Sequence, residues 1–182
     1  MGRLAGSGQG PGKTRRARSL RRRQPVLNTG TAIDAKDCWQ AWCDGSALPN
    51  PGKIGVGVVL MAPDGRCSEK SQLLNVFGCN NEAELHALCA ALEMAAAAGA
   101  RKLLLRGDSD VAIRYVRGPD STQIARLNVL VAAARDWLRS FDEVQMVWIP
   151  RHRNRDADRL SRQALGLPPS PAPLARPRRR GR

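Results

Sequence analysis

Three strand-like segments follow one another with short links near the start of the main body of this chain, and a long helical segment comes after them. The strand patterns occupy residues 38–44, 54–62 and 67–77, and the sequence APDGR between the last two is typical of a hairpin turn. Consecutive strands with links this short pair in antiparallel fashion and form a meander. Any fold for this chain must therefore place three neighbouring antiparallel strands in one sheet and pack a helix against it.

Helical and strand-like patterns alternate through the rest of the body. Residues 82–100 carry leucines at helical spacing and reach a glycine near their end, where helices commonly stop. The later segments are strands at 102–107 and 144–149 and helices at 109–117, 122–140 and 155–166. The order β-β-β-α-β-α-α-β-α predicts an α/β fold with one mixed sheet and helices packed on its faces.

Basic residues are concentrated at the two ends of the chain. The 182 residues hold 30 Lys and Arg against 16 Asp and Glu, a net charge of +14, but residues 1–36 account for +8 and residues 167–182 for +5. Both segments lack aliphatic periodicity, so we expect disordered basic tails around a nearly neutral domain at 37–166. Arginine-rich tails bind nucleic-acid phosphates by releasing counterions, which makes such contacts their expected role.

The composition excludes several classes of protein. No apolar run approaches the ~18 residues needed to cross a bilayer, and the N-terminus lacks the apolar segment of a secretory signal. The five cysteines include no CxxC pair and are accompanied by two histidines, which argues against a disulfide framework or a zinc site. We expect a cytoplasmic protein without membrane contact. An Arg-rich N-terminus is also typical of organellar transit peptides, and that alternative stays open.

Four acidic residues stand at positions that a solvated surface does not explain. Asp44 and Asp108 each end a predicted strand, while Glu84 and Asp158 each lie in the first turn of a predicted helix. Each has a structural explanation when taken alone. Asp44 can open a turn, and Asp108 or Asp158 can complement a helix start. Glu84 can partner Asn81 in an N-x-x-E capping box.

Taken together, the four acids indicate a metal site. The functional crevice of an open α/β sheet lies outside the carboxyl ends of its parallel strands, and Asp44 and Asp108 occupy such ends. If these two strands are neighbours, their backbones lie ~4.8 Å apart and the two carboxylates can share one ion. The helix starts would bring Glu84 and Asp158 to the same edge. Carboxylates this close repel one another unless hard divalent cations bind them, and Mg²⁺ is the natural candidate.

Four short segments of the body carry a distinctive combination of residues in order along the chain. They are WCDGSALPNPGKIGVGVVL at 42–60, NNEAEL at 80–85, GDS at 107–109 and WIPRHRNRDADRLS at 148–161. They resemble, in turn, the opening strand with its NPG turn, the NN-x-x-EL helix start, the third carboxylate and the VPR-x-x-N-x-x-AD-x-LA ending of type 1 ribonuclease H. The resemblance covers the whole body and neither tail. It implies a ribonuclease H-like fold, in which a five-stranded mixed sheet has three antiparallel strands followed by two parallel ones.

The resemblance also implies a function and a set of site residues. The reaction would be metal-dependent, endonucleolytic hydrolysis of the RNA strand of an RNA/DNA hybrid, giving 5′-phosphate and 3′-hydroxyl ends. Two Mg²⁺ ions would serve as cofactors, with Mn²⁺ as a substitute, and the protein would act as a monomer. Carried over to this sequence, the catalytic and metal-binding residues are Asp44, Glu84, Asp108 and Asp158. The residues that contact or support the substrate are Gly45, Ser46, Asn50, Asn80 and Asn81.

The chain departs from the family pattern at two positions. The family often has Thr before its Asn pair and Gln two residues after its third carboxylate, where this chain has Cys79 and Asp110. These differences bear on contacts with the substrate strands and not on the metal ligands. The remaining nearby acids, Glu82 and Asp156, fall off the motif and are interpreted, like Asp110, as surface or helix-start charges.

His152 lies in the loop before the last helix, where some members of the family carry a histidine that helps protons or product leave. The resemblance therefore adds His152 to the catalytic residues. The competing interpretation is an ordinary solvated loop residue between two arginines, and the sequence leaves both open.

Two alternatives compete with the enzyme. The first is a catalytically weak ribonuclease H-like module that binds nucleic acid or a partner protein, against which all four carboxylates being present argues. The second treats the neutral body as an interaction domain and the basic tails as a tether to nucleic acid. A deoxyribonuclease or resolvase of the same fold is less consistent with the NPG and NN-x-x-EL segments.

Overall fold

The computed structural model describes residues 26–27, 33–34, 36–118 and 120–171, and the predicted tails lie largely outside this range. The elements are β1 (Val26–Leu27), β2 (Trp39–Leu48), β3 (Gly52–Met61), β4 (Cys67–Gly78), α1 (Asn80–Ala97), β5 (Lys102–Gly107), α2 (Asp110–Arg117), α3 (Ala125–Leu138), β6 (Glu143–Trp148), the 3₁₀ turn η1 (Arg151–Arg153) and α4 (Arg155–Ala164). From β2 onward, this is the element order that the sequence predicts.

The sheet has the mixed topology expected from the sequence. Its strand order is β1-β6-β5-β2-β3-β4, with β2, β3 and β4 forming the antiparallel meander. β5 pairs in parallel with β2, and β6 pairs in parallel with β5. Parallel neighbours need long crossovers, and α1 and the α2–α3 pair supply them. The five-stranded ribonuclease H-like sheet is therefore confirmed.

One strand was not predicted. β1 lies within residues 1–36, which the sequence assigns to a disordered tail, and it pairs in parallel with the outer edge of β6. A two-residue strand leaves no periodic pattern in a sequence, because its pairing comes from the open edge of the neighbouring strand. A further contact follows along the chain, where the backbone N–H of Ile33 donates to Oε1 of Gln145 on β6 at 3.1 Å.

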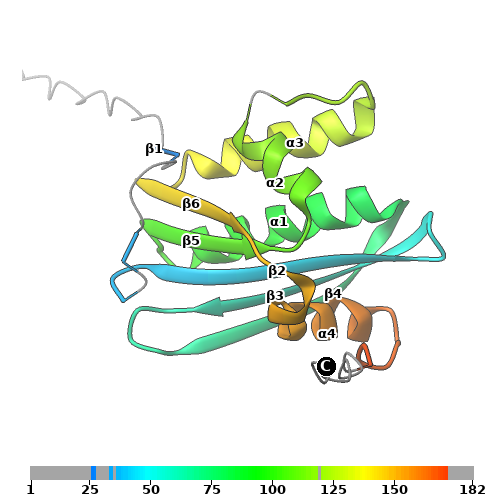
Figure 1. Cartoon of the computed structure of the whole chain (residues 1–182), viewed down its shortest axis with the longest axis horizontal. Coiled ribbons are helices and arrows are strands. Elements are labelled where there is room, and N and C mark those ends of the chain that lie inside the picture. The colour runs from blue at the N-terminus through cyan, green and yellow to red at the C-terminus, as the bar shows by residue number, and fades with distance from the viewer. Residues whose placement is uncertain (1–25, 28–32, 35, 119, 172–182) are drawn as a thin grey trace, which may run out of the picture.

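Helices cover both faces of the sheet (Figure 1). α1, α2 and α3 lie on one face and α4 lies on the other, over β2, β3 and β4. Coverage on both sides explains why β3 is buried along almost its whole length, since its side chains alternate between two helix layers. The largest fully buried side chains come from β3, α1, β5 and the helices around them, and they form one continuous core.

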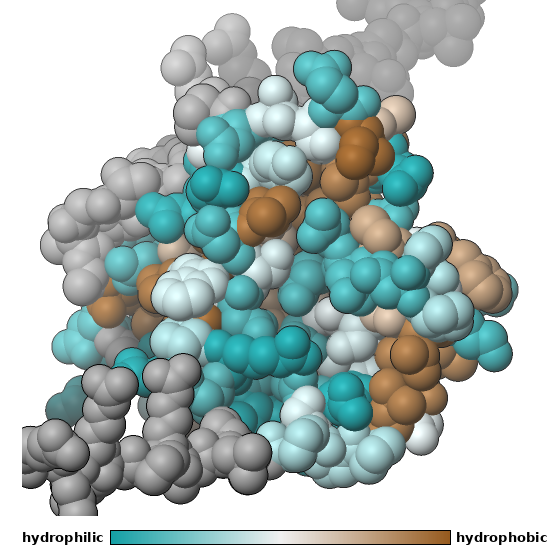
Figure 2. All heavy atoms as spheres, turned by 45° about the vertical axis from the view of Figure 1, so that its right-hand side comes forward, coloured by the Kyte–Doolittle hydropathy of each residue, from teal (hydrophilic) through white to brown (hydrophobic). Residues whose placement is uncertain are grey.

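The surface is mostly polar. Figure 2 shows one face on which hydrophilic residues gather over the middle and apolar side chains gather toward the right-hand edge. Within the described part of the chain, no helix has the length and apolar character required to cross a membrane.

Candidate metal centre

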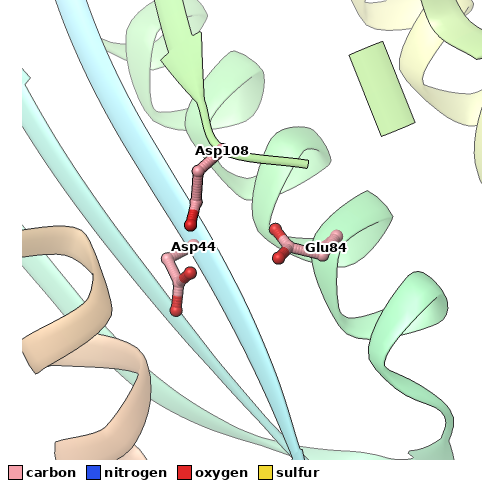
Figure 3. Close-up of side chains that lie close together, drawn as sticks. All are labelled: Asp44, Glu84 and Asp108. Carbon is pink, nitrogen blue, oxygen red and sulfur yellow. The ribbon is translucent and has the colours of Figure 1, made fainter. Parts of the chain in front are cut away.

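Three of the four predicted acids meet at one point on the sheet. Asp44 comes from β2, Glu84 from the first turn of α1 and Asp108 from the residue after β5. One carboxylate oxygen of each lies within 4.8 Å of the others. Figure 3 shows the Asp44 and Asp108 side chains directed toward each other, with Glu84 reaching toward them from the helix. Oxygen atoms at this spacing are the ligand type that a hard divalent cation prefers.

The position of Asp44 differs from the prediction in one respect. The sequence predicts that the first strand ends at Asp44, whereas β2 continues to Leu48 because its second half pairs with β3. The parallel ladder with β5 does stop here, since its last pair is Cys43 with Gly107. Asp44 is therefore the first residue of β2 beyond the end of β5, and Asp108 follows the end of β5 itself. The two carboxylates meet at the point where the parallel ladder stops, and not where β2 ends.

Glu84 has no part in starting its helix. The N-cap of α1 is Cys79 and not the predicted Asn81, and Glu82 takes the capping role by accepting the backbone N–H of Cys79 at 2.7 Å. Glu82 is thus a helix-start charge, as predicted, although it is buried and not on the surface. It also pairs with Arg126 at 2.9 Å. Because Glu82 caps the helix, the carboxylate of Glu84 is left to face Asp44 and Asp108.

Gly45 allows this close approach. The α1 backbone at Ala83 and Glu84 lies against the Cα of Gly45, so closely that a Cβ there would overlap the backbone carbonyl of Ala83. Any larger residue at position 45 would push the start of α1, and with it Glu84, away from Asp44. The glycine of the DGS segment therefore sets the distance between a strand ligand and a helix ligand.

Burial and mutual repulsion hold the carboxylates in an unfavourable state when no cation is present. Burial raises the pKa of Asp44 to about 6, against the hydrogen bond from Ser161, which lowers it, and the charges of Asp108 and Asp158 raise it further. Burial likewise raises the pKa of Glu84 well above its ordinary value, and the charges of Asp44 and Asp108 add to the effect. A bound cation would relieve both effects. The donor set therefore fits a divalent metal ion.

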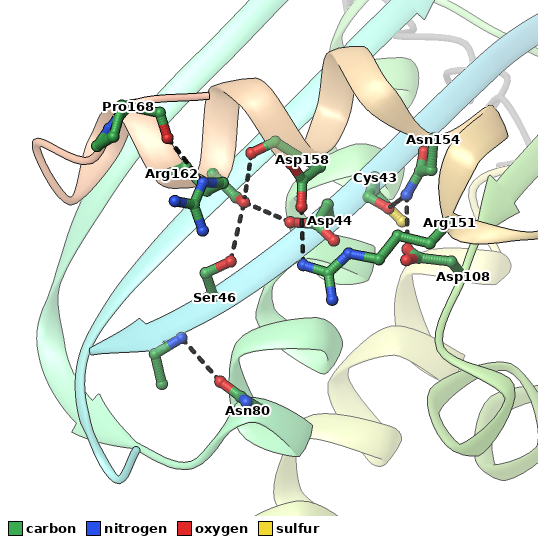
Figure 4. Close-up of polar contacts among 12 residues, drawn as sticks. Cys43, Asp44, Ser46, Asn80, Asp108, Arg151, Asn154, Asp158, Arg162 and Pro168 are labelled. Carbon is green, nitrogen blue, oxygen red and sulfur yellow. Dashed lines mark hydrogen bonds and ion pairs between the residues drawn. The ribbon is translucent and has the colours of Figure 1, made fainter. Parts of the chain in front are cut away.

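Asp158, the fourth predicted ligand, lies outside the group of three. Its side chain is buried, and its Oδ1 accepts a hydrogen bond from Nη2 of Arg151 at 2.8 Å (Figure 4). Asp158 is neutralised by an arginine that stands seven residues earlier, across the η1 turn. To coordinate the same ion as Asp44, Asp158 would have to exchange this arginine for the metal.

Two more residues from the segment around α4 support the acids. Asn154 is buried, and its Nδ2 donates to Oδ1 of Asp108 at 2.7 Å and to the backbone carbonyl of Cys43 at 2.9 Å. Asn154 therefore connects β2 to the carboxylate that follows β5. Ser161 donates its hydroxyl to Oδ2 of Asp44. Sequence reasoning missed the roles of Arg151, Asn154 and Ser161, although all three stand in the segment whose motif identified Asp158.

The predicted substrate residues lie around the start of α1 and the β2–β3 turn. Oδ1 of Asn80 accepts the backbone N–H of Ala47 at 3.0 Å, and Oδ1 of Asn50 accepts the backbone N–H of Asn80 at 3.1 Å. Within the described part of the chain, the Nδ2 groups of Asn50 and Asn80 have no such bond, so they can donate outward. Asn81 is exposed beside them.

His152 lies in η1, on the other side of the acids from the asparagines. It is exposed and lines a cavity of about 610 Å³ together with Arg151, Arg155 and Asp158. The structure thus brings His152 near the fourth acid but gives it no hydrogen bond to the described residues. Its catalytic role stays a prediction.

Comparison with known proteins identifies the family. Residues 42–164 match the model of the reverse transcriptase-like family. The chain belongs to this family, which has the ribonuclease H-like fold. It is 37% identical over 125 residues to the ribonuclease HI of Halobacterium salinarum, and 31% identical over 124 residues to the bifunctional protein Rv2228c of Mycobacterium tuberculosis. These matches cover 69% and 67% of this chain but only 63% and 34% of the relatives, so it spans less than two thirds of either protein.

Solved structures of the family have the same fold. The crystal structure of the ribonuclease H1 of Halobacterium salinarum matches 70% of this chain and 97% of its own, with a TM-score of 0.67 and 36% identity. The crystal structure of LC11-RNase H1 in complex with an RNA/DNA hybrid matches 70% of this chain and 96% of its own, with a TM-score of 0.64 and 28% identity. Family membership and the acidic group together indicate a ribonuclease H enzyme.

Proposed function

We propose that this protein is a divalent-metal-dependent endonuclease that hydrolyses the RNA strand of RNA/DNA hybrids. The observation that carries the proposal is the meeting of Asp44, Glu84 and Asp108, from three separate motif segments, with ligand atoms within 4.8 Å of one another. A buried group of three acids is costly without a cation, and this chain has family relatives that are named as ribonucleases H. The proposal includes two Mg²⁺ ions, with Mn²⁺ as a substitute.

Asp44, Glu84 and Asp108 would hold the ions, and Asp158 would join them after releasing Arg151. When bound, the ions would activate water and stabilise the departing 3′ oxygen, so that the products carry 5′-phosphate and 3′-hydroxyl ends. Asn154 would keep the Asp108 carboxylate in place through the 2.7 Å hydrogen bond from its Nδ2. His152, exposed at the edge of the site, would help protons or product leave.

Recognition of the hybrid would rest on the opposite side of the acids. Nδ2 of Asn50 and Nδ2 of Asn80 would donate to the substrate backbone, because the Oδ1 atoms of both residues are already engaged. Asn81 would contribute at the same helix start. Glu84 and the backbone at Gly45 and Ser46 would contact the 2′-hydroxyl that marks an RNA strand, which allows recognition without reading a sequence.

The test is a cleavage assay on matched substrates. The purified full-length protein with Mg²⁺ is expected to cut the RNA strand of an RNA/DNA hybrid and to leave double-stranded DNA and double-stranded RNA of the same sequence intact. Asp108→Asn keeps the shape of the side chain and removes its charge, so it should reduce cleavage by a factor of about 10³ or more. Cleavage that persists in Asp108→Asn would exclude the assigned site, and a wild-type protein that binds the hybrid without cutting it would indicate a binding module.

A further inference from the structure

Ser161 departs from the family motif at a position that touches the metal centre. The family ending reads AD-x-LA, and this chain reads ADRLS, so a hydroxyl stands where the motif has a methyl group. The Ser161 side chain is completely buried, and its hydroxyl donates to Oδ2 of Asp44, which is itself 2% exposed. Ser161 thus gives this chain a contact with Asp44 that the family motif does not provide.

The hydroxyl of Ser161 has three oxygen neighbours but one proton. Besides Oδ2 of Asp44, it lies 3.0 Å from the backbone carbonyl of Asp158 and 3.1 Å from Oγ of Ser46. A carboxylate is the strongest acceptor of the three, so the proton is directed to Asp44. Ser46 must then be the donor in its own bond with Ser161. The result is a hydrogen-bond chain that runs from Ser46 through Ser161 to Asp44.

The backbone of α4 holds Ser161 rigidly in this position. Gly55 and Gly57 on β3 lie directly under the backbone of Ser161, and a Cβ on either glycine would overlap the helix. The helix backbone therefore rests on the strand at the level of Ser161 with no side chain between them. Ser71 on β4 adds a second attachment, because its hydroxyl donates to the backbone carbonyl of Leu160 at 2.8 Å. A hydroxyl held this firmly can fix the orientation of the carboxylate that it contacts.

We propose that Ser161 is a positioning residue for Asp44: it holds Oδ2 so that the other carboxylate oxygen stays directed at Glu84 and Asp108, ready for the divalent ions. The inference rests on the proposed function, because it assigns Asp44 to a metal. Groups that hydrogen-bond to metal ligands set their orientation, and losing one typically weakens metal affinity or activity by ~10–100-fold. Ser161 acts through Asp44 and would not touch the substrate.

The experiment compares Ser161→Ala with Ser71→Ala in the full-length protein. Alanine restores the motif residue at position 161, so the variant should fold. Mn²⁺ binding is measured by calorimetry without nucleic acid, and kcat and KM are measured on a hybrid with Mg²⁺. Ser161→Ala should bind Mn²⁺ about tenfold more weakly and show a kcat lower by about tenfold, with KM for the hybrid within about twofold of wild type. Ser71→Ala also loses a hydroxyl that anchors α4, but it should keep wild-type Mn²⁺ affinity and kcat.

The possible outcomes separate this inference from the function on which it rests. Unchanged Mn²⁺ affinity in Ser161→Ala, in a protein that cleaves hybrids normally, would overturn the positioning role and leave the enzyme assignment intact. Equal losses in Ser161→Ala and Ser71→Ala would also overturn it, since the seating of α4 would then be the cause. A wild-type protein that binds no Mn²⁺ would reject the metal centre and this inference together.

Discussion

At the scale of single residues, the acidic group trades stability for metal binding. Asp44 is buried beside two other carboxylates, and its pKa of about 6 shows that the metal-free fold favours its neutral form. Neutral carboxyl groups bind divalent ions poorly, so the ion must displace a proton. The same arrangement that makes the site attractive to a cation therefore makes the empty site costly at neutral pH.

Asp44→Asn should stabilise the metal-free protein in a pH-dependent way. The folded-state pKa of about 6 lies above the ordinary value of 3.8, so the proton on Asp44 contributes stability that is fully present below pH 3.8 and lost as the pH rises through 6. Asparagine does not suffer this loss. We expect the variant to gain up to about 3 kcal/mol in unfolding free energy at pH 8 and little at pH 4. Urea unfolding in EDTA at both pH values tests this, and an equal gain at both would assign the effect to packing instead.

Residue-scale details were predictable only where a motif fixed them. Asp44, Glu84 and Asp108 could be assigned from the DGS, NN-x-x-EL and GDS segments, and the structure brings them together. The ion pair of Asp158 with Arg151 could not, because it depends on how the η1 turn folds back across seven residues. Local spacing states which residues are available, whereas tertiary geometry decides which of them pair.

At the scale of elements, the site depends on how closely α1 approaches β2. The start of α1 rests on Gly45 without a side chain between them, and this contact sets the position of Glu84. The sequence predicts both elements correctly, but it misplaces the end of β2 and the N-cap of α1. Both errors have the same origin. Pairing with β3 extends β2 beyond Asp44, and the burial of Glu82 moves the helix start to Cys79.

Gly45→Ala should separate the two elements and disrupt the site. The new Cβ would overlap the Ala83 carbonyl, which is backbone and cannot move without shifting the helix. We expect a loss of roughly 1–3 kcal/mol in unfolding free energy, as for other overpacked sites, and loss of measurable Mn²⁺ binding. Gly107→Ala is the matched control beside the same acids, since its nearest neighbour would be Sγ of Cys43 at an ordinary 3.6 Å. Similar losses in both variants would contradict this account.

At the scale of the whole molecule, the charge is divided between parts with different tasks. The body at 37–166 is nearly neutral because its bases are balanced by acids, among them the group that would hold the metal ions. The order of the elements from β2 to α4 could be predicted because each is long enough to show a period. The two-residue strand β1 could not, since its pairing is set by the edge of β6.

The basic ends of the sequence should govern the salt dependence of binding and not the chemical step. Six arginines between residues 15 and 23 and five in residues 167–182 carry most of the net charge of +14. Each phosphate contact contributes about 0.7–0.9 to the slope of log affinity against log salt concentration. Replacing these eleven arginines with glutamine should weaken hybrid binding and flatten that slope by several of these increments, while single-turnover cleavage at saturating protein stays within about twofold. Binding would be measured in Ca²⁺ across a salt series.

A lysine version of the same eleven positions provides the control for this last prediction. Counterion release depends on charge and not on the identity of the cation, so the lysine variant should keep a slope close to that of the wild type. A glutamine variant with an unchanged slope would mean that the body alone provides the phosphate contacts, through residues such as Arg151 and Arg155 beside the 610 Å³ cavity. A slope that falls in both variants would instead indicate specific arginine contacts, because only the guanidinium group binds a phosphate in bidentate fashion.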